Sequence, residues 1–434
     1  MKFYSTNNKN NLVSFKEAVL SGIANDGGLY MPVEIPKLPS VFINSIDKIS
    51  LKEISFNIAK QFFGQELNDE ALLDIINSTI TFDAPLVPLN DELNILELFH
   101  GPTLAFKDFG AKFMANVMSY LNKDLDKEIK ILAATSGDTG SAVANGFYKV
   151  KGIKVVLLYP SKKVSKIQEQ QLTTLGENIT ALEVKGTFDD CQRLVKQAFL
   201  DKELTKHCTL SSANSINVAR LLPQSFYYFY AYSQIKDKNL PLIISVPSGN
   251  FGNLTAGLFA MEMGLPVHKF IAATNANDVF PKYLETSVFE VKPSVKTLSN
   301  AMDVGNPSNF ARILNLNNHD YNLIKQKIFS SSFSDEQTKD AIKEIKSKYN
   351  YIIDPHGAVG YLAMKKFLDE NNYKKLNGVI LETAHPAKFA DIVESVLKEK
   401  VEIPERLKSC LTKKKISIEI SKDYLDFKNF ILSS

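Results

Sequence analysis

Lys107 is the residue whose type and surroundings in the sequence could do chemistry. It lies in the stretch 96–110, where an apolar strand pattern stops at Gly101-Pro102 and a helical pattern begins at the lysine. Phe106 and Phe109 flank it, and partial removal from water favours the neutral amine of a lysine, which can attack a carbonyl carbon. The alternative is a solvated lysine at the start of a helix, because most lysines of a chain are surface charges.

A small-residue turn is the second candidate for chemistry. It follows a strand pattern over 242–246, precedes a helical pattern from Leu254, and consists of Ser248, Gly249, Asn250, Phe251 and Gly252. The two glycines allow backbone N–H groups to converge on an anion at the positive end of a helix. Tight turns with two glycines are common, so the turn alone is weak support. Together with Lys107 it indicates pyridoxal phosphate, which needs an amine for its aldehyde and a cradle for its phosphate.

A second polar turn connects a predicted strand over 131–134 to a helix. It consists of Thr135, Ser136, Gly137, Asp138 and Thr139. Its hydroxyls and exposed N–H groups could bind another anion. The alternative is a cluster that caps the following helix, and both interpretations can be true at once.

Asn214 and Arg220 flank the start of a predicted helix over 215–234. A guanidinium binds a phosphate through two parallel hydrogen bonds, although Arg220 could equally form a structural ion pair. Lys163 and Lys166 are weaker candidates for binding the same charge.

Thr383 ends a predicted buried strand over 379–383. Successive strand residues point to opposite faces, so if the Thr383 side chain enters a cleft, Glu382 points away from it. A hydroxyl beside the pyridine nitrogen of the cofactor does not enforce protonation of that nitrogen, so the ring withdraws electrons less strongly than a protonated ring would. His356 and His385 are expected to be structural or exposed to solvent.

The composition is that of a globular chain of 434 residues, long enough for two or three domains. The 51 Lys and Arg residues nearly balance the 48 Asp and Glu residues, so no general positive field favours nucleic acid. Cys191, Cys208 and Cys410 are scattered without CxxC spacing, which argues against disulfides and a metal site. The sequence shows no secretory signal and no membrane-spanning apolar run, so we expect a cytoplasmic protein without membrane contact.

Strand and helix patterns alternate from Lys130 onward, which predicts an α/β fold of two mostly parallel-sheet halves around a cleft. Ligand sites in such sheets lie beyond the carboxyl ends of strands. Helical patterns over 13–23, 51–63 and 69–78 predict a helical N-terminal region. Residues 294–312 are expected to form a loop, and the segment that follows, up to residue 349, is expected to be polar and helical. The expected domains are a helical N-terminal domain at 1–82, a catalytic α/β region of two halves at 83–400, and a C-terminal tail at 401–434.

Five motifs occur in a fixed order along the chain. They are FHGPTLAFKDFG around Lys107, ATSGDTG at 134–140, NSIN followed by Arg220, PSGNFG at 247–252, and TAHPAKF at 383–389. In these motifs and their order the chain resembles the threonine synthase family in its longer bacterial and fungal form. The resemblance covers the whole chain and implies the tryptophan synthase β-like fold, the second fold type of pyridoxal-phosphate enzymes.

The resemblance also implies roles for the residues in the motifs. Lys107 would carry the cofactor covalently and serve as the catalytic base. The cofactor-binding residues would be Lys107, Asp138, Ser248, Gly249, Asn250, Phe251, Gly252 and Thr383. The substrate-binding residues would be Thr135, Ser136, Gly137 and Thr139 for the carboxylate, and Asn214 and Arg220 for the phosphate. Related enzymes often have Asn in place of Asp138, and an aspartate would oppose the cofactor's phenolic oxyanion unless the two share a proton.

The expected reaction, from the resemblance, is the conversion of O-phospho-L-homoserine and water to L-threonine and phosphate, the last step of threonine biosynthesis. The expected partner is this small-molecule substrate, and the chain would be a monomer or homodimer. Two alternatives stay open. One is a phospho-lyase of the same fold that releases a 2-oxo acid and ammonia, and the other is a non-catalytic protein that binds a phosphate ligand.

Overall fold

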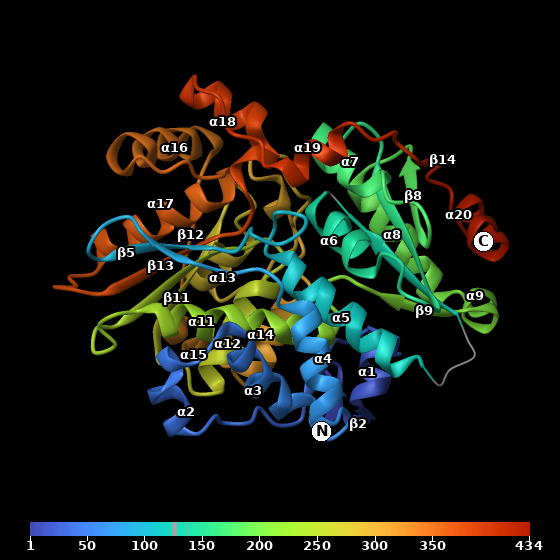
Figure 1. Cartoon of the computed structure of the whole chain (residues 1–434), viewed down its shortest axis with the longest axis horizontal. Coiled ribbons are helices and arrows are strands. Elements are labelled where there is room, and N and C mark those ends of the chain that lie inside the picture. Colours follow the sequence, from blue (N-terminus) through green and yellow to red (C-terminus); the bar gives the residue numbers. More distant parts are fainter. Residues whose placement is uncertain (124–127, 136) are drawn as a thin grey trace.

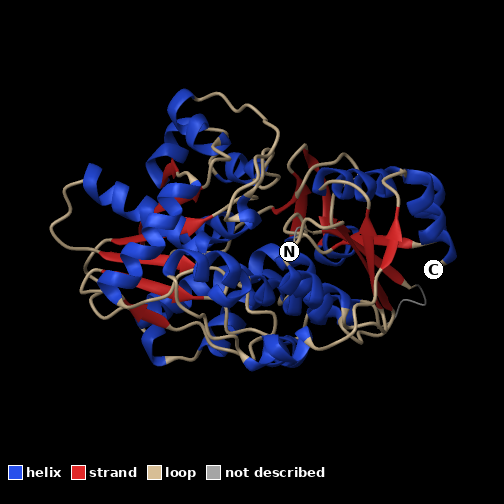
Figure 2. Cartoon of the chain, turned by 90° about the horizontal axis from the view of Figure 1, so that it is seen from above, coloured by secondary structure: helices blue, strands red, loops and turns tan. Residues whose placement is uncertain are grey.

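The computed structural model describes residues 1–123, 128–135 and 137–434. Its strands form three sheets, two of which are large and lie on opposite sides of the molecule (Figure 2). The third is a small sheet in the N-terminal region. The N-terminal region, in blue, lies across the bottom of the view in Figure 1. The predicted α/β fold with mostly parallel sheets is therefore confirmed.

The larger sheet has six strands in the order β12-β11-β10-β13-β5-β4, parallel except for β4. Their bounds are β4 Leu86–Pro88, β5 Leu93–Glu97, β10 Leu242–Pro247, β11 Val267–Thr274, β12 Ile328–Ser332 and β13 Asn377–Glu382. Every residue of β10 is buried, because helices cover both faces. One face packs against α11 (Ser225–Gln234) and α12 (Gly252–Glu262), and the other against α16 (Asp335–Tyr349) and α17 (Pro355–Glu370).

The smaller sheet has five parallel strands in the order β14-β8-β7-β6-β9. Their bounds are β6 Ile129–Ala134, β7 Ile153–Pro160, β8 Ile179–Val184, β9 Thr209–Ser212 and β14 Ile418–Ile420. One face packs against α5 (Lys107–Leu121) and α6 (Asp138–Phe147). The other packs against α8 (Phe188–Leu200) and α20 (Tyr424–Ser433), so the C-terminal segment completes this half. The neighbouring α7 (Lys166–Thr173) and α9 (Lys202–His207) begin at side-chain caps.

The N-terminal region is helical, as predicted, but also contains a three-stranded antiparallel sheet. Its elements are β1 Lys2–Ser5, β2 Asn8–Ser14, α1 Phe15–Ser21, β3 Tyr30–Pro32, α2 Ser40–Asn44, η1 Ile46–Lys48, α3 Leu51–Phe63 and α4 Asp69–Thr79. The predicted helix over 13–23 starts later, because Val13 pairs with Phe3 in the sheet and Ser14 caps α1.

Two further predictions about secondary structure were wrong in detail. The predicted helix over 215–234 is interrupted, with α10 at Val218–Leu221 and η2 at Leu222–Gln224 before α11. Pro223 causes this, since proline has no N–H to continue an α-helix. The polar segment before Tyr349 contains the edge strand β12, which pairs with β11.

The remaining helices are α13 Val279–Thr286, η3 Asn300–Met302, α14 Phe310–Leu316, α15 Tyr321–Lys327, η4 Pro386–Phe389, α18 Ala390–Leu397 and α19 Glu405–Leu411. Over the described ranges, no helix has the length and apolar character that a membrane crossing requires.

Arg312 ties the N-terminal region to the centre of the molecule. Its side chain is fully buried on α14. It donates hydrogen bonds to three carbonyl oxygens. They belong to Tyr30, at 3.0 Å for the shorter of two contacts, to Ser215 at 3.0 Å and to Ile216 at 2.6 Å. A single guanidinium therefore fixes the segment that leads into α10.

We expect Arg312→Leu to lower the free energy of unfolding by about 3 kcal/mol or more, because each buried carbonyl that loses a donor costs about 1–3 kcal/mol. Urea unfolding monitored by circular dichroism measures this. The control Lys366→Leu removes a half-exposed cation of α17 and should change the free energy by less than about 0.5 kcal/mol. Equal effects of the two substitutions would contradict the assignment.

Candidate active site

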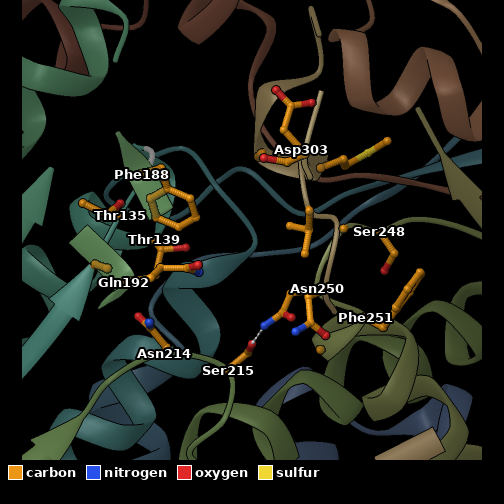
Figure 3. A pocket seen from close by; sticks show the side chains of 18 of the residues that line it. Thr135, Thr139, Phe188, Gln192, Asn214, Ser215, Ser248, Asn250, Phe251 and Asp303 are labelled. Atoms are coloured by element: carbon orange, nitrogen blue, oxygen red, sulfur yellow. Dashed lines mark hydrogen bonds between the residues drawn. The ribbon is translucent and has the colours of Figure 1, made fainter. Parts of the chain in front are cut away.

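A cavity of about 820 Å³ lies where the carboxyl ends of strands from both sheets meet. Its lining includes Thr135 after β6, Asn214 after β9, Ser248 after β10 and Thr383 after β13. Figure 3 shows Thr135, Thr139 and Asn214 on one wall and Ser248, Asn250 and Phe251 on the other. The parallel topology of both sheets thus brings together segments far apart in the sequence.

Lys107 is the first residue of α5 and lines this cavity. Its Nζ lies 5.0 Å from the centre of the Phe106 ring, and it forms no salt bridge with the described residues. The pKa of Lys107 is lowered to about 8, chiefly by burial and also by the positive charges of Lys388 and Arg220, while Asp138 and Asp354 oppose the shift. The neutral fraction of this amine near neutral pH is therefore far larger than that of a solvated lysine.

Asp108, the acid next to Lys107 in sequence, is engaged elsewhere. Its buried carboxylate accepts hydrogen bonds from the backbone N–H of Thr103 at 2.8 Å and from the Thr103 hydroxyl at 2.6 Å. Burial raises the pKa of Asp108, and the Thr103 hydrogen bonds oppose that shift. Asp108 therefore stabilises the loop before α5 and does not pair with Lys107.

The turn after β10 ends at the start of α12. Phe251 adopts a left-handed conformation with φ of 55°, and α12 begins at Gly252. The N–H groups of residues 249–252 donate to no acceptor within the described part of the chain. Four free donors at the positive end of a buried helix make an anion site.

Close packing explains both glycines of this turn. A Cβ at Gly249 would lie 2.7 Å from the Met302 Cα, and one at Gly252 would lie 2.9 Å from the Ser215 Cβ. The neighbouring segments therefore approach the turn as closely as glycine permits.

The polar side chains of the same turn have partners in the protein. Ser248 donates to the side chain of Asn253. Asn250 donates to the Ser215 hydroxyl at 3.0 Å and accepts from the N–H of Ser308 (Figure 3). These side chains hold the shape of the turn, and its backbone supplies the free donors.

The turn after β6 is held by a threonine hydroxyl. Thr135 Oγ1 accepts from the N–H groups of Gly137 and Gly140 at 2.9 and 2.8 Å, so it caps the start of α6. Gly137 has a φ of 140°, which favours glycine. Thr135 and Thr139 line the cavity, whereas Ser136 lies outside the described residues.

Asp138 lines the cavity and is almost fully buried. It accepts hydrogen bonds from Lys388 Nζ at 2.7 Å and from Gln168 Nε2 at 3.0 Å. Burial alone would raise the pKa of Asp138, but the ammonium groups of Lys388 and Lys107 hold it well below the ordinary range. Asp138 is thus a carboxylate whose counter-ion is provided by the fold.

Asn214 and Arg220 both line the cavity. Arg220 Nη1 donates to the Ala213 carbonyl at 2.7 Å, and Arg220 forms no salt bridge with the described residues. The buried Arg220 Nε and Asn214 Oδ1 also lack partners there. Burial lowers the pKa of Arg220 to about 10, with Asp108 opposing. A buried guanidinium without a carboxylate is suited to bind an anionic ligand, whereas Lys163 and Lys166 do not line the cavity.

Thr383 and Glu382 lie on opposite sides of the strand end. Thr383 lines the cavity. Glu382 is fully buried behind it and accepts from the Asp354 N–H at 2.7 Å at the start of α17. Burial, with the Asp354 carboxylate nearby, raises the pKa of Glu382 well above its ordinary range. The side chain nearest the cavity at this strand end is thus the hydroxyl.

Sequence reasoning missed the segment 291–306 as a wall of the cavity. The sequence predicted a loop over 294–312; this range is irregular up to Asn309 apart from η3, but α14 begins at Phe310. No spacing shows that His356 Nε2 accepts from the Ala301 N–H at 3.2 Å. Asp303, held by Thr297 and Asn275, also belongs to this wall, and burial raises its pKa to about 6. Lys388 was missed as well, although it lies within one of the five motifs.

The cavity fits pyridoxal phosphate. It holds an amine with a pKa near 8 for the aldehyde, and free N–H donors at a helix start for the phosphate. Within the described part of the chain Arg220 Nε has no acceptor, so this guanidinium can donate to a second anion in the same cavity.

Comparison with protein families agrees with this assignment of the cofactor. Residues 81–381 match the family model described as pyridoxal-phosphate dependent enzyme. Residues 2–80 match the threonine synthase N terminus, and residues 357–431 match the threonine synthase C-terminal domain.

Similar proteins cover the whole chain. Threonine synthase of Escherichia coli is 43% identical over 94% of both chains, and that of Saccharomyces cerevisiae is 40% identical over 93% of this chain and 91% of the yeast one. The crystal structure of the Escherichia coli enzyme superposes with a TM-score of 0.93 over 100% of both chains, at 41% identity. A threonine synthase of Brucella melitensis with bound pyridoxal phosphate superposes with a TM-score of 0.92 at 32% identity, over 100% of this chain and 99% of that one.

We expect covalent labelling of Lys107 by pyridoxal phosphate to accelerate with pH through a midpoint near 8, because only the neutral amine attacks an aldehyde. Borohydride trapping followed by peptide mass spectrometry measures the label. Lys107→Ala should abolish it, and persistent labelling at another lysine would contradict the assignment.

Gly252→Val should weaken the binding of pyridoxal phosphate more than tenfold, because the new side chain must displace Ser215 or the turn itself. The loss of binding should precede any loss of fold. Cofactor titration and thermal unfolding of the same preparation separate the two effects. An unchanged cofactor affinity would show that the turn does not hold the phosphate.

Proposed function

Since the chain belongs to the threonine synthase family of pyridoxal-phosphate dependent enzymes, we propose that it converts O-phospho-L-homoserine and water to L-threonine and phosphate. This is a carbon–oxygen lyase reaction and the last step of threonine biosynthesis. One observation carries the proposal. A lysine with a pKa near 8 and a buried arginine without a carboxylate partner share a cavity with the free N–H groups of a helix start.

The proposed cofactor site uses both halves of the molecule. Lys107 holds the cofactor through its amine, and the backbone at 249–252 binds the cofactor phosphate. Thr383 and Asp138 both line the cavity, where Thr383 would offer its hydroxyl to the ring nitrogen of the cofactor and Asp138 would lie beside the phenolic oxygen. When bound, pyridoxal phosphate supplies an electron sink for carbanions formed on the substrate.

Lys107 moves the protons in this proposal. With its amine free, Lys107 would take protons from the α and β carbons of the substrate and return them. The Cγ–O bond breaks, and its electron pair leaves with the phosphate. The γ carbon gains a proton and becomes the methyl group of threonine, while water adds at the β carbon. The released phosphate could act as a base toward this water.

The proposed substrate site contains two anion-binding parts. The turn with Thr135, Gly137 and Thr139 receives the carboxylate, with N–H donors at the start of α6. Ser136 is proposed for the same role from its place in the motif. Arg220 and Asn214 bind the substrate phosphate. Binding the phosphate orients the reacting carbons with energy from a remote group.

Product analysis tests the function directly. The protein loaded with pyridoxal phosphate should release equal amounts of threonine and phosphate from O-phospho-L-homoserine. Release of a 2-oxo acid and ammonia would identify the phospho-lyase alternative. Binding of the substrate without any product would indicate a non-catalytic phosphate-binding protein.

We also propose a cytoplasmic location and a monomer or homodimer. All three cysteines are free thiols, as expected of a chain kept in a reducing compartment. Cys191 is fully buried, and burial raises its pKa to about 12, so it is expected to be unreactive. Size-exclusion chromatography with light scattering would determine the oligomeric state.

Arg220→Lys keeps the positive charge but loses the planar pair of donors. We expect turnover of O-phospho-L-homoserine to fall about 10- to 100-fold, since hydrogen bonds to charged groups contribute about 1.5–3 kcal/mol. Labelling of Lys107 by pyridoxal phosphate should persist. The control Arg406→Lys, outside the cavity, should keep wild-type turnover. Loss of cofactor labelling in Arg220→Lys would make Arg220 a cofactor or structural residue.

A further inference from the structure

The roles proposed above leave the lysine of the buried Asp138–Lys388 pair without a function. Lys388 Nζ lies 2.7 Å from Asp138 Oδ1, and their side chains are 0% and 3% exposed. Asp138 begins α6 beside the smaller sheet, whereas Lys388 lies in η4 after the last strand of the larger sheet. The pair therefore joins the two halves at the site.

Lys388 has two hydrogen-bond acceptors among the described residues. Besides Asp138, it donates to the Thr103 carbonyl at 2.9 Å, which also accepts from Gln171 at 3.2 Å. Asp138 Oδ1 is shared with Gln168 Nε2. Asp138 reaches the cavity lining, and Lys388 does not. Lys388 therefore makes no contact with a ligand in the cavity and acts on the chemistry through its charge and through Asp138.

Four charged groups face the Lys107 amine. Asp138 and Asp354 favour its ammonium form, and Lys388 and Arg220 oppose it. Of the two acids Asp138 exerts the larger effect, and Asp354 is hydrogen-bonded to His356 Nδ1 at 2.7 Å. A bare carboxylate at Asp138 would hold Lys107 as an unreactive ammonium, because charges interact strongly in a buried site.

We propose that Lys388 is a positioning residue that neutralises Asp138, so that Lys107 can present a neutral amine to an aldehyde while Asp138 stays fixed at the edge of the cavity. The inference rests on the proposed role of Lys107 as the amine that carries the cofactor. It does not depend on the identity of the substrate.

A charge cycle on the full-length protein, freed of cofactor, tests the proposal. Four proteins are compared: wild type, Lys388→Met, Asp138→Asn and the double variant. Each is reacted with pyridoxal phosphate over a range of pH, trapped with borohydride, and the label on Lys107 is quantified by peptide mass spectrometry. The readout is the pH midpoint of the labelling rate, which requires no turnover.

The single variants should shift this midpoint in opposite directions. Lys388→Met leaves the carboxylate uncompensated and should raise the midpoint by one pH unit or more. Asp138→Asn leaves the second ammonium uncompensated and should lower it. The double variant removes both charges and should return the midpoint to within about half a unit of wild type, and Lys388→Arg should stay close to wild type.

A merely structural role would not produce opposite shifts that cancel. If Lys388→Met does not fold, the downward shift of Asp138→Asn and the recovery in the double variant still decide the question. The control Lys415→Met removes another lysine paired with two carboxylates, Glu169 and Glu183, away from the cavity, and should leave the midpoint unchanged.

Two results would overturn the inference. Midpoints that stay unchanged, or move in the same direction in both single variants while Lys107 is labelled normally, would refute the role of Lys388 alone. Absence of label on Lys107 in the wild type would refute both this inference and the proposed cofactor attachment.

Discussion

The site depends on keeping one buried amine free of a carboxylate partner. A lysine in a protein interior ordinarily pairs with an acid, and such a pair would keep it protonated. Here the nearby acids are engaged elsewhere, Asp108 by Thr103, Asp138 by Lys388 and Asp354 by His356. Burial favours the neutral form of this amine, and the engagement of the surrounding acids with other partners keeps them from holding it as an ammonium.

The parts of the fold and site that depend on local sequence could be predicted. Parallel strands read as apolar runs, and the chemistry-bearing turns follow them, so the positions of Lys107, Thr135, the 248–252 turn and Thr383 at element ends were predictable. The observed α3 begins at the predicted residue, since Ser50 forms a capping box with Glu53. In these places local propensity and tertiary structure agree.

The parts that depend on distant packing could not be predicted. Asp138 and Lys388 are brought together by the relative placement of two sheets, and no periodicity encodes that placement. The strand β12 is polar because it lies at a sheet edge, and its pattern alone favoured a helix. The hydrogen bond from the Asn250 side chain to the Ser215 hydroxyl likewise joins segments that are distant in the sequence.

The insertion of β13 between β10 and β5 has a consequence for how the chain folds. Residues 377–382 are synthesised long after residues 93–97, so β5 lacks its parallel neighbour until residues 377–382 have left the ribosome. Contacts of such high sequence separation form slowly, and an unpaired strand edge promotes association with other chains. Lys107, which follows β5, can face the turn after β10 only once β13 fills the gap. The nascent chain therefore remains dependent on protection from aggregation until its catalytic centre is assembled.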